Sequence, residues 1–410
     1  MISFLIVLFI MGVIVYLNKK GFPLAVNLGV GTLVLATMSL KLTSIPQIII
    51  RTITDVGTLE LVASVSLIQI LGYILEQTKK LQKLIRALHE LISSLKIQLM
   101  MIPSIIGLIP GPGIVMLSAP LIEKAAGESV MAGLKSYVNY WFRAAIQFSC
   151  PISFSFIITI SLVKVNPLYL FLAQLPVTII MYVSGYLREL RFVRRKGSNS
   201  EIISGDKASV LKNILALLWK SDFLLVIFIL TLLFDIKLYI TVIVTIFMVV
   251  LQEKIRLKPL ILMIKKGFSP KMLFLILSMM LFKTAIEETA TMESISSWWN
   301  TTSWPPEMLF FVMPLLIGLI TGAYAGAAAI SFSLFAPMII ANNLNIFFVA
   351  VVYSFGKIGV MLSPVNASVL LTADYFNANP NNVFKRIARS LPSAFAMILA
   401  IYFVGSFYLD

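Results

Sequence analysis

Long apolar runs, separated by short basic segments, dominate the chain and limit what it can fold into. Apolar residues make up 59% of the 410 positions and charged residues only 12%, whereas soluble globular chains have about 45–50% apolar and about 25% charged residues. Because so little polar surface cannot cover a water-facing globule, the runs must face lipid. At about 20 residues per helical span, the sequence predicts an all-α polytopic membrane protein with no sizeable water-soluble domain.

Ten segments have the length and character of full transmembrane helices. They are residues 2–17, 23–40, 57–76, 133–163 and 167–187 in the first half, and 218–234, 237–252, 271–286, 345–376 and 390–409 in the second. Glycine and proline interrupt two further apolar stretches, 98–125 and 307–341, so we expect re-entrant hairpins there. The first run lacks a basic leader and a small-residue cleavage site, and we expect it to be a retained span.

The distribution of Lys and Arg predicts the orientation. With both hairpins re-entrant and the N-terminus outside, segments on the cytoplasmic side carry 26 Lys and Arg residues and external segments carry 4. Cytoplasmic loops are the ones enriched in Lys and Arg, so the count favours an N-out, C-out topology. The same clustering explains the net charge of +15 without nucleic acid, and we expect no nucleic-acid partner.

An internal repeat divides the chain into two halves. Residues 103–111 read PSIIGLIPG and residues 314–322 read PLLIGLITG, with six of nine positions identical at an offset of 211. LSAP and LFAP follow in the same order, and then CPIS and SPVN. Because five spans separate corresponding elements, the halves must face opposite ways. The sequence therefore predicts a five-plus-five inverted repeat, with residues 1–200 as the first copy and 201–410 as the second.

Each predicted repeat contains scaffold spans, one hairpin and one broken span (133–163 or 345–376). The segment 79–96 has apolar residues on one helical face and basic residues largely opposite, which predicts an amphipathic helix at the cytoplasmic interface. Its His89 we interpret as a solvated polar residue. The segment 287–304, with three tryptophans suited to the headgroup layer, is expected at the equivalent place outside.

The interruptions predict a binding site. In hydrocarbon an unpaired backbone amide or carbonyl costs several kcal/mol, so breaks are tolerated where they line a cavity. The prolines at 151 and 364 should release carbonyls about one turn upstream, and inward-pointing helix ends attract ions. Small residues near the breaks and hairpin tips are the predicted substrate contacts; they are Gly111, Gly113, Ser149, Ser153, Thr321, Gly322, Ser363 and Asn366. Ser and Asn side chains can instead simply join helices.

Two basic residues lie within the broken spans. Arg143 is eight residues before Pro151 and Lys357 is seven before Pro364, so we interpret them as near-equivalent substrate contacts. A structural ion pair or a snorkelling side chain is the alternative. Because the spans contain few acids, Na⁺ held by backbone carbonyls is preferred over H⁺ as the coupling ion. The candidate carbonyls belong to Gly111, Cys150, Gly322 and Ser363.

The single Cys150 excludes an intramolecular disulfide, and one cysteine with one histidine argues against a His/Cys metal site. We read Cys150 as a small packed residue. We expect no cofactor besides a coupling ion.

With GLIPGPG in the first hairpin and LSPVNASVLLT after the second break, the chain resembles a branch of the ion transporter superfamily, which includes divalent-anion/sodium symporters and gluconate, lactate and citrate permeases. The resemblance implies a homodimer, a moving transport domain that holds both hairpins and both broken spans, and an elevator mechanism. The tips here, PGPG and TGAYAG, differ from the Ser-Asn-Thr of the dicarboxylate symporters, so dicarboxylate specificity is not carried over.

These features predict a secondary active transporter of a small, carboxylate-like organic anion, coupled to Na⁺ or H⁺ and multi-pass in the inner (plasma) membrane, with lipid as its other partner. A cation/proton antiporter is one alternative. An intramembrane enzyme is another, but no nucleophile–base pair or carboxylate cluster stands out, and we expect no enzyme activity.

Overall fold

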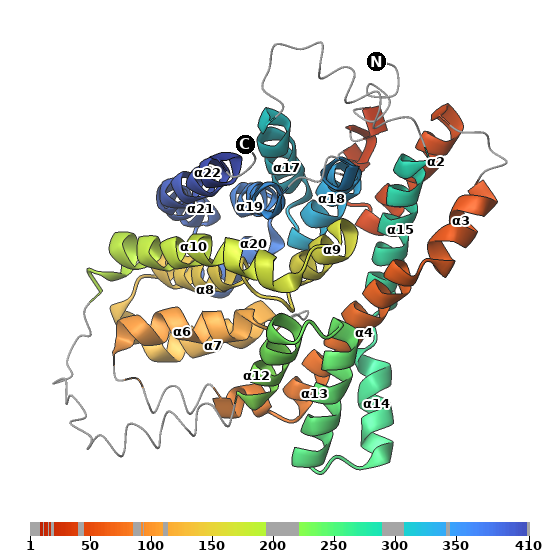
Figure 1. Cartoon of the computed structure of the whole chain (residues 1–410). Coiled ribbons are helices and arrows are strands. Elements are labelled where there is room, and N and C mark those ends of the chain that lie inside the picture. Colours follow the sequence, from red (N-terminus) through yellow and green to blue (C-terminus); the bar gives the residue numbers. More distant parts are fainter. Residues whose placement is uncertain are drawn as a thin grey trace.

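The computed structural model describes residues 9–10, 12–14, 16–17, 20–39, 45–84, 92, 94–109, 114–193, 221–288, 307–341 and 345–407. Within these ranges the regular structure is helical throughout (Figure 1). Four helical stretches are long and apolar enough to cross a membrane: Val56–Gln77, Pro167–Leu190, Ile346–Tyr375 and Pro380–Gly405. Several apolar helices of 10–17 residues accompany them. The fold is that of a membrane-embedded, all-helical protein.

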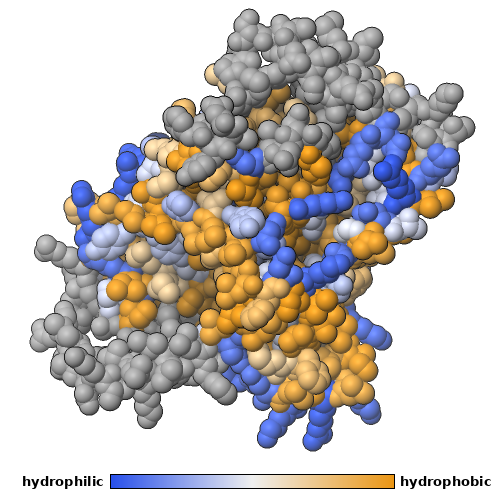
Figure 2. Space-filling model, viewed as in Figure 1, coloured by the Kyte–Doolittle hydropathy of each residue, from blue (hydrophilic) through white to orange (hydrophobic). Residues whose placement is uncertain are grey.

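Large apolar side chains lie on the surface of the molecule. Leu257 is 72% exposed, Leu233 69% and Phe247 64%. Figure 2 shows apolar residues over the lower part of this face, with hydrophilic residues at its lowest edge. In water such a surface would drive aggregation, whereas in a bilayer it meets hydrocarbon. The exposed apolar residues therefore agree with the membrane assignment.

One set of helices, here named the α4 group, lies on the right in Figure 1. Within it α2 packs on α15, α4 packs on α13, α3 packs on α15 and α14 packs on α4. Its members are α2 (Leu24–Ser39), α3 (Ile45–Thr54), α4 (Val56–Gln77), α12 (Asp222–Phe228) with the π-helix η4 (Ile229–Leu233), α13 (Leu238–Gln252), α14 (Leu257–Gly267) and α15 (Pro270–Glu287).

The remaining helices surround α19 and are here named the α19 group. Its first part is α6 (Leu95–Gly107), α7 (Ile114–Ala126), η2 (Gly127–Ser129), α8 (Ala132–Ile146), α9 (Phe154–Val163) and α10 (Pro167–Gly185), which continues as the π-helix η3 (Tyr186–Leu190). Its second part is α17 (Glu307–Thr321), α18 (Tyr324–Ala341), α19 (Ile346–Leu362), α20 (Ala367–Tyr375), α21 (Pro380–Ser390) and α22 (Pro392–Phe407).

The packing within the α19 group follows one scheme twice. The helices α6 and α7 pack as a pair, and so do α17 and α18. The first arm of each pair packs on a helix that ends at a proline break, α6 on α8 and α17 on α19. The second arms cross over, so that α18 packs on α9 and α7 packs on α20. Segments from the two halves of the chain are thereby brought side by side.

Ion pairs hold each group together from within. Each of the seven ion pairs in the described part of the chain joins two residues of the same group or of the segments that flank its helices, such as Lys80 with Asp222 (2.9 Å) and Lys135 with Glu123 (2.7 Å). The two groups meet through α4 against α9, α15 against α18, and α10 against η4. A small cavity lies between the two groups. Its wall consists of apolar residues, Ile68 and Ile227 among them, and one glycine.

The predicted hairpins and broken spans coincide with helix pairs. Residues 98–125 correspond to α6 and α7, 307–341 to α17 and α18, 133–163 to α8 and α9, and 345–376 to α19 and α20. Three short helices, α3, α14 and α21, lie outside the predicted spans and are an addition. Of the predicted amphipathic helix 79–96, residues 80–84 are helical, Leu95 and Lys96 begin α6, and 85–91 with 93 lie outside the described residues, as do 289–304.

Candidate functional site

Proline breaks end both α8 and α19. A proline lacks the amide hydrogen that would bond the carbonyl four residues earlier, so Pro151 frees the carbonyl of Gln147 and Pro364 frees that of Val360. Both carbonyls accept hydrogen bonds from side chains. Gln147 O accepts from Lys357 Nζ and from the Tyr353 hydroxyl (3.3 Å), and Val360 O accepts from Asn366 Nδ2 (2.9 Å). The carbonyl of Gln147 is released as predicted, whereas that of Val360 also accepts the backbone amide of Ser363 (3.1 Å).

The second halves of the broken spans begin with matching caps. Ser153 is the N-cap of α9 and Asn366 is the N-cap of α20, each two residues after its proline. Their amides donate to Cys150 O and Ser363 O respectively, both at 3.1 Å. Since a carbonyl oxygen has two lone pairs, these two candidate Na⁺ ligands each retain one acceptor site.

Two tyrosines link the breaks crosswise. Tyr140 of α8 accepts a hydrogen bond from Asn366, the cap of α20 (2.8 Å), and its hydroxyl also contacts that of Tyr324 (2.8 Å). Tyr353 of α19 lies 3.3 Å from Ser155 in the first turn of α9. Each tyrosine is eleven residues before its proline, so equivalent positions make equivalent bonds to the opposite span.

Lys357 is fully enclosed at the first break. The side chain is 2% exposed, and its ammonium donates to Gln147 O at the C-terminal end of α8. The nitrogen also lies 4.4 Å, 5.1 Å and 5.5 Å from the ring centroids of Tyr353, Phe148 and Tyr324. Helix C-termini and ring faces both attract cations. The charge of Lys357 is therefore compensated by dipoles, with no acidic partner in the described ranges.

The tip of the second hairpin touches the second break. Gly322 has a φ of +61°, which favours glycine, and a Cβ there would lie 2.9 Å from Val365 and 3.1 Å from Ser363 Oγ. Ser363 Oγ donates to Leu319 O at 2.5 Å. Thr321 bonds the carbonyl of Gly318 in its own helix (3.4 Å). The structure thus brings the tip and the break together as the sequence predicted.

Arg143 has a different environment from Lys357. It is 4% exposed and lies against the end of α6, where a Cβ on Gly107 would come within 2.7 Å of Arg143 Cγ. On α19 the residue that packs against the corresponding glycine, Gly318, is Gly356. The predicted near-equivalence of Arg143 and Lys357 is therefore off by one residue, which rotates Lys357 to another face of its helix.

The other predicted residues are distributed as follows. The Ser149 hydroxyl accepts from Thr178 on α10 (3.0 Å), away from the tyrosines. Cys150 is buried, with Sγ 3.7 Å from Leu108 O, as expected for a packed residue. Gly111 and Gly113 lie outside the described residues. The central cluster therefore consists of Ser153, Ser155, Tyr140, Tyr324, Tyr353, Lys357 and Asn366.

One small cavity adjoins this region, and a larger one lies at the boundary between the two groups. One of about 10 Å³, room for about one water molecule, is lined by Lys357, Tyr324, Tyr353 and the unpartnered hydroxyl of Ser331. The other, about 590 Å³, opens between the two groups at the ends of α4, α9 and α13 that are predicted to be external. Lys237 lines it and is ion-paired with Glu60.

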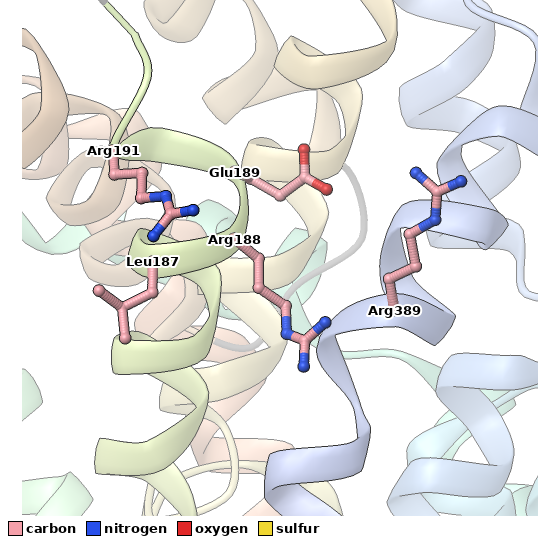
Figure 3. A pocket seen from close by; sticks show the side chains of 5 residues that line it. All are labelled: Leu187, Arg188, Glu189, Arg191 and Arg389. Carbon is pink, nitrogen blue, oxygen red and sulfur yellow. The ribbon is translucent and has the colours of Figure 1, made fainter.

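An arginine pocket lies apart from the centre. It has a volume of about 450 Å³ and lies where η3 faces α21, with Arg188, Arg191 and Arg389 in its wall (Figure 3). Glu189 in the same wall is ion-paired to Arg386. Sequence predicts this end to be cytoplasmic, so the pocket belongs to the basic side of the protein.

Sequence reasoning missed six residues of this region: Tyr140, Ser155, Tyr324, Tyr353, Gln147 and Asn139. For Tyr140 and Tyr353 a signal was present. Both lie eleven residues before a proline, and the internal repeat had already identified these two prolines as equivalent. Gln147 contributes through its backbone carbonyl, so its residue type carries no signal. Asn139 stands in α8 one turn before Arg143 and is described below.

No group of three or more His, Cys, Asp or Glu side chains in the described ranges could hold a metal ion. No curated protein matches the chain. A family model matches residues 1–405, which is nearly the entire chain. The chain therefore belongs to the family described as "Protein of unknown function (DUF401)".

Proposed function

We propose that this protein is a secondary active transporter of a small organic anion. The observation that carries the proposal is the meeting of both helix breaks at one buried cluster, where Lys357, Tyr353, Tyr140 and Asn366 serve the broken ends. Breaking two helices inside a membrane is costly unless the freed groups line a site. Discontinuous helices that meet near the midplane are the way secondary transporters bind substrate and ions.

The proposed architecture is a five-plus-five inverted repeat with both hairpins re-entrant. It is supported by the crossed packing of α18 on α9 and α7 on α20, since an inverted repeat places each element against its counterpart's partner. The crosswise bonds of Tyr140 and Tyr353 support it at the level of atoms. With ten spans, the charge distribution supports N-out and C-out in the inner membrane.

The charge of the buried residues favours an anionic substrate. Arg143 and Lys357 are both deeply buried in the broken spans, and no Asp or Glu in the described ranges forms an ion pair with either. Two acids of the predicted spans, Glu60 and Asp222, are already paired with Lys237 and Lys80. An organic anion would supply negative charge where the protein supplies none.

Transport would proceed by movement of the α19 group, which contains the site, against the α4 group. The seven ion pairs lie within the groups, which supports treating each as a unit. Resemblance to the ion transporter superfamily adds a homodimer, in which exposed apolar faces of the α4 group would meet a second copy. Na⁺ or H⁺ would be the coupling ion.

The test is uptake by purified protein in liposomes. A panel of radiolabelled mono-, hydroxy- and dicarboxylates would be offered with an inward Na⁺ gradient, an inward H⁺ gradient, or neither. We expect concentrative uptake of at least one acid that requires one of the gradients. If every acid accumulates no faster than in protein-free liposomes, the proposed function is wrong.

A cation/proton antiporter is the second candidate within transport, because retained carbonyl lone pairs at Cys150 and Ser363 could bind a cation. The same liposomes would then show Na⁺ flux driven by a pH gradient without organic substrate. An intramembrane enzyme remains the alternative from another class, and it would convert a lipid or peptide in the absence of any gradient.

A further inference from the structure

One face of α8 carries buried polar groups that the protein does not use. The Asn139 side chain is 0% exposed, and neither its Oδ1 nor its Nδ2 has a hydrogen-bond partner. One turn later, Arg143 is 4% exposed and its second terminal nitrogen, Nη2, has no partner. The other, Nη1, has one long bond, 3.4 Å to Ser118 Oγ. Residues four apart share a helix face, so these atoms face the same region.

Leaving these groups unpaired is expensive. A buried polar group without a hydrogen bond lowers the stability of the folded protein, and so does an uncompensated charge in the bilayer interior. The neighbouring buried cation, Lys357, avoids this cost through Gln147 O and three rings. Arg143 has no comparable compensation in the described part of the chain, so packing alone does not explain its presence.

The surroundings of this face are rich in hydrogen-bond donors. The helices α7, α8 and α20 pack on one another, and both α7 and α20 begin here, at Ile114 and Ala367. Ser118 lies in the second turn of α7, and Ser136 of α8 reaches the carbonyl of Thr372 on α20 (3.4 Å). The N-terminus of a helix carries partial positive charge. The start of α7, a guanidinium and an amide thus converge between α7, α8 and α20, while the start of α20 is already capped by Asn366 Oδ1.

We propose that Arg143 and Asn139 together bind one carboxylate group of the ligand. The guanidinium matches a carboxylate with two parallel N–H donors, which a point-like ammonium cannot do, and Asn139 Nδ2 supplies a further donor. Lys357 is thereby a fixed cation that caps α8, and Arg143 is the residue that recognises the substrate. The inference deepens the proposed function, on which it rests for its biological meaning, while binding itself requires no transport.

The site also has a predicted selectivity. A neutral amide of the same shape leaves the guanidinium charge uncompensated, so it should bind far more weakly than the acid. A carboxylate also presents acceptors for the otherwise empty Nη2 of Arg143 and Nδ2 of Asn139. Asn139 Oδ1 remains free to accept a hydroxyl, which favours hydroxy acids over simple acids.

The experiment measures ligand-induced thermal stabilisation of the purified, detergent-solubilised protein. The probes are acetate, lactate, glycolate, gluconate, succinate and citrate, with lactamide and propionamide as neutral analogues and sulfate and phosphate as inorganic oxyanions. The variants are Arg143→Gln, Arg143→Lys and Asn139→Leu. The matched control is Thr178→Val, which removes a buried hydroxyl bonded to Ser149 on the opposite side of the break.

We expect at least one carboxylate to raise the melting temperature saturably, and the amides to have no effect. Arg143→Gln should weaken that binding at least 100-fold, Asn139→Leu about tenfold, and Arg143→Lys to an intermediate extent, with Thr178→Val unchanged. Without ligand, Arg143→Gln should melt at the same temperature as the wild type or higher, because it removes an uncompensated charge. An arginine with a purely structural role would instead lower it.

Three results would overturn the inference: no carboxylate stabilises the wild type, Arg143→Gln binds as well as the wild type, or the amides bind as well as the acids. If Arg143→Gln fails to fold, Asn139→Leu carries the same test. Saturable binding that is lost in Arg143→Gln, without uptake in liposomes, would sustain this inference and refute the transport function. Gradient-driven uptake that is unchanged in Arg143→Gln would sustain the transport function and refute this inference.

Discussion

At the scale of single residues, the two buried cations, Lys357 and Arg143, differ in how their charge is compensated. Lys357 neutralises the exposed carbonyl end of α8, the place where a broken-helix protein would otherwise attract a metal cation. Its ammonium donates to Gln147 O and lies near three aromatic rings. Arg143 instead leaves one nitrogen unpaired. The charge of Lys357 is therefore compensated within the protein, whereas Arg143 keeps an unpaired nitrogen that the proposed carboxylate would bind.

Removing Lys357 should expose a cation site. We expect Lys357→Ala to melt at a lower temperature than the wild type in choline chloride, and to be restabilised by NaCl at the same ionic strength. At ten times the Kd, the gain is about 1.4 kcal/mol. Differential scanning fluorimetry in detergent measures this. The matched control is Lys283→Ala, a buried lysine that is ion-paired with Glu287 (3.4 Å), which should show no response to Na⁺. Equal responses of the two variants would refute the cation-like role of Lys357.

Counting residues could locate Lys357 and Arg143 in the broken spans but not their surroundings. Seven and eight residues before a proline look nearly equal in a sequence, yet one residue turns a helix by about 100°. That rotation directs Arg143 to α6 and Lys357 to the end of α8. The two tyrosines could have been found, because both stand at the same distance from their prolines. An unpaired Asn139 could not, since pairing depends on every neighbour.

At the scale of elements, the closest contact is between α17 and α19. Gly318 and Gly359 lie where the two helices cross, and a Cβ on either would overlap backbone atoms of the other helix, at Gly356 O and Leu315 O respectively. Small residues let helices approach closely in membranes, where packing replaces the hydrophobic effect as the force for association. This contact fixes the second hairpin on the broken span that it faces.

Two alanine substitutions in α19 should have opposite outcomes. Gly359→Ala places its methyl group in the backbone of α17, so we expect a loss of about 1–3 kcal/mol or more. Gly356→Ala meets nothing closer than 3.8 Å, and by reducing the freedom of the unfolded chain it should be neutral or stabilising by up to about 1 kcal/mol. Thermal unfolding in detergent compares the two. Equal destabilisation would show that the crossing is looser than described.

Most elements were predicted from the sequence, but the short ones were missed. Hairpins and broken spans carry strong apolar runs with Gly and Pro at their middles, and these signals correspond to α6–α9 and α17–α20. The helices α3, α14 and α21 have only 10 or 11 residues and carry basic side chains such as Arg51 and Lys265. Their apolar and polar residues lie largely on opposite faces, so a helical signal was present, and packing of α14 on α4 and of α3 on α15 stabilises them.

At the scale of the whole molecule, orientation can be tested across one short helix. In a Cys150→Ala background, Phe234→Cys and Arg256→Cys place exposed thiols at the two ends of α13. We expect a membrane-impermeant maleimide to label Phe234→Cys on intact cells, and Arg256→Cys only after permeabilisation. The reason is the excess of Lys and Arg on the segment that follows α13. Labelling of both thiols on intact cells would contradict the predicted topology. Labelling of Arg256→Cys alone on intact cells would show that the orientation is opposite to the predicted one.

The boundary between the two groups has a mechanical consequence. Ion pairs stay within each group, and the small cavity at the boundary has an apolar wall. The apolar part of this boundary has no directional bond to break, whereas the cavity at its predicted external end is lined by charged side chains such as Glu60 and Lys237. The length of the stroke would then be set by bilayer thickness and by the chain segments that connect the groups. If the protein works by the proposed movement, its turnover should respond to the thickness of the lipid.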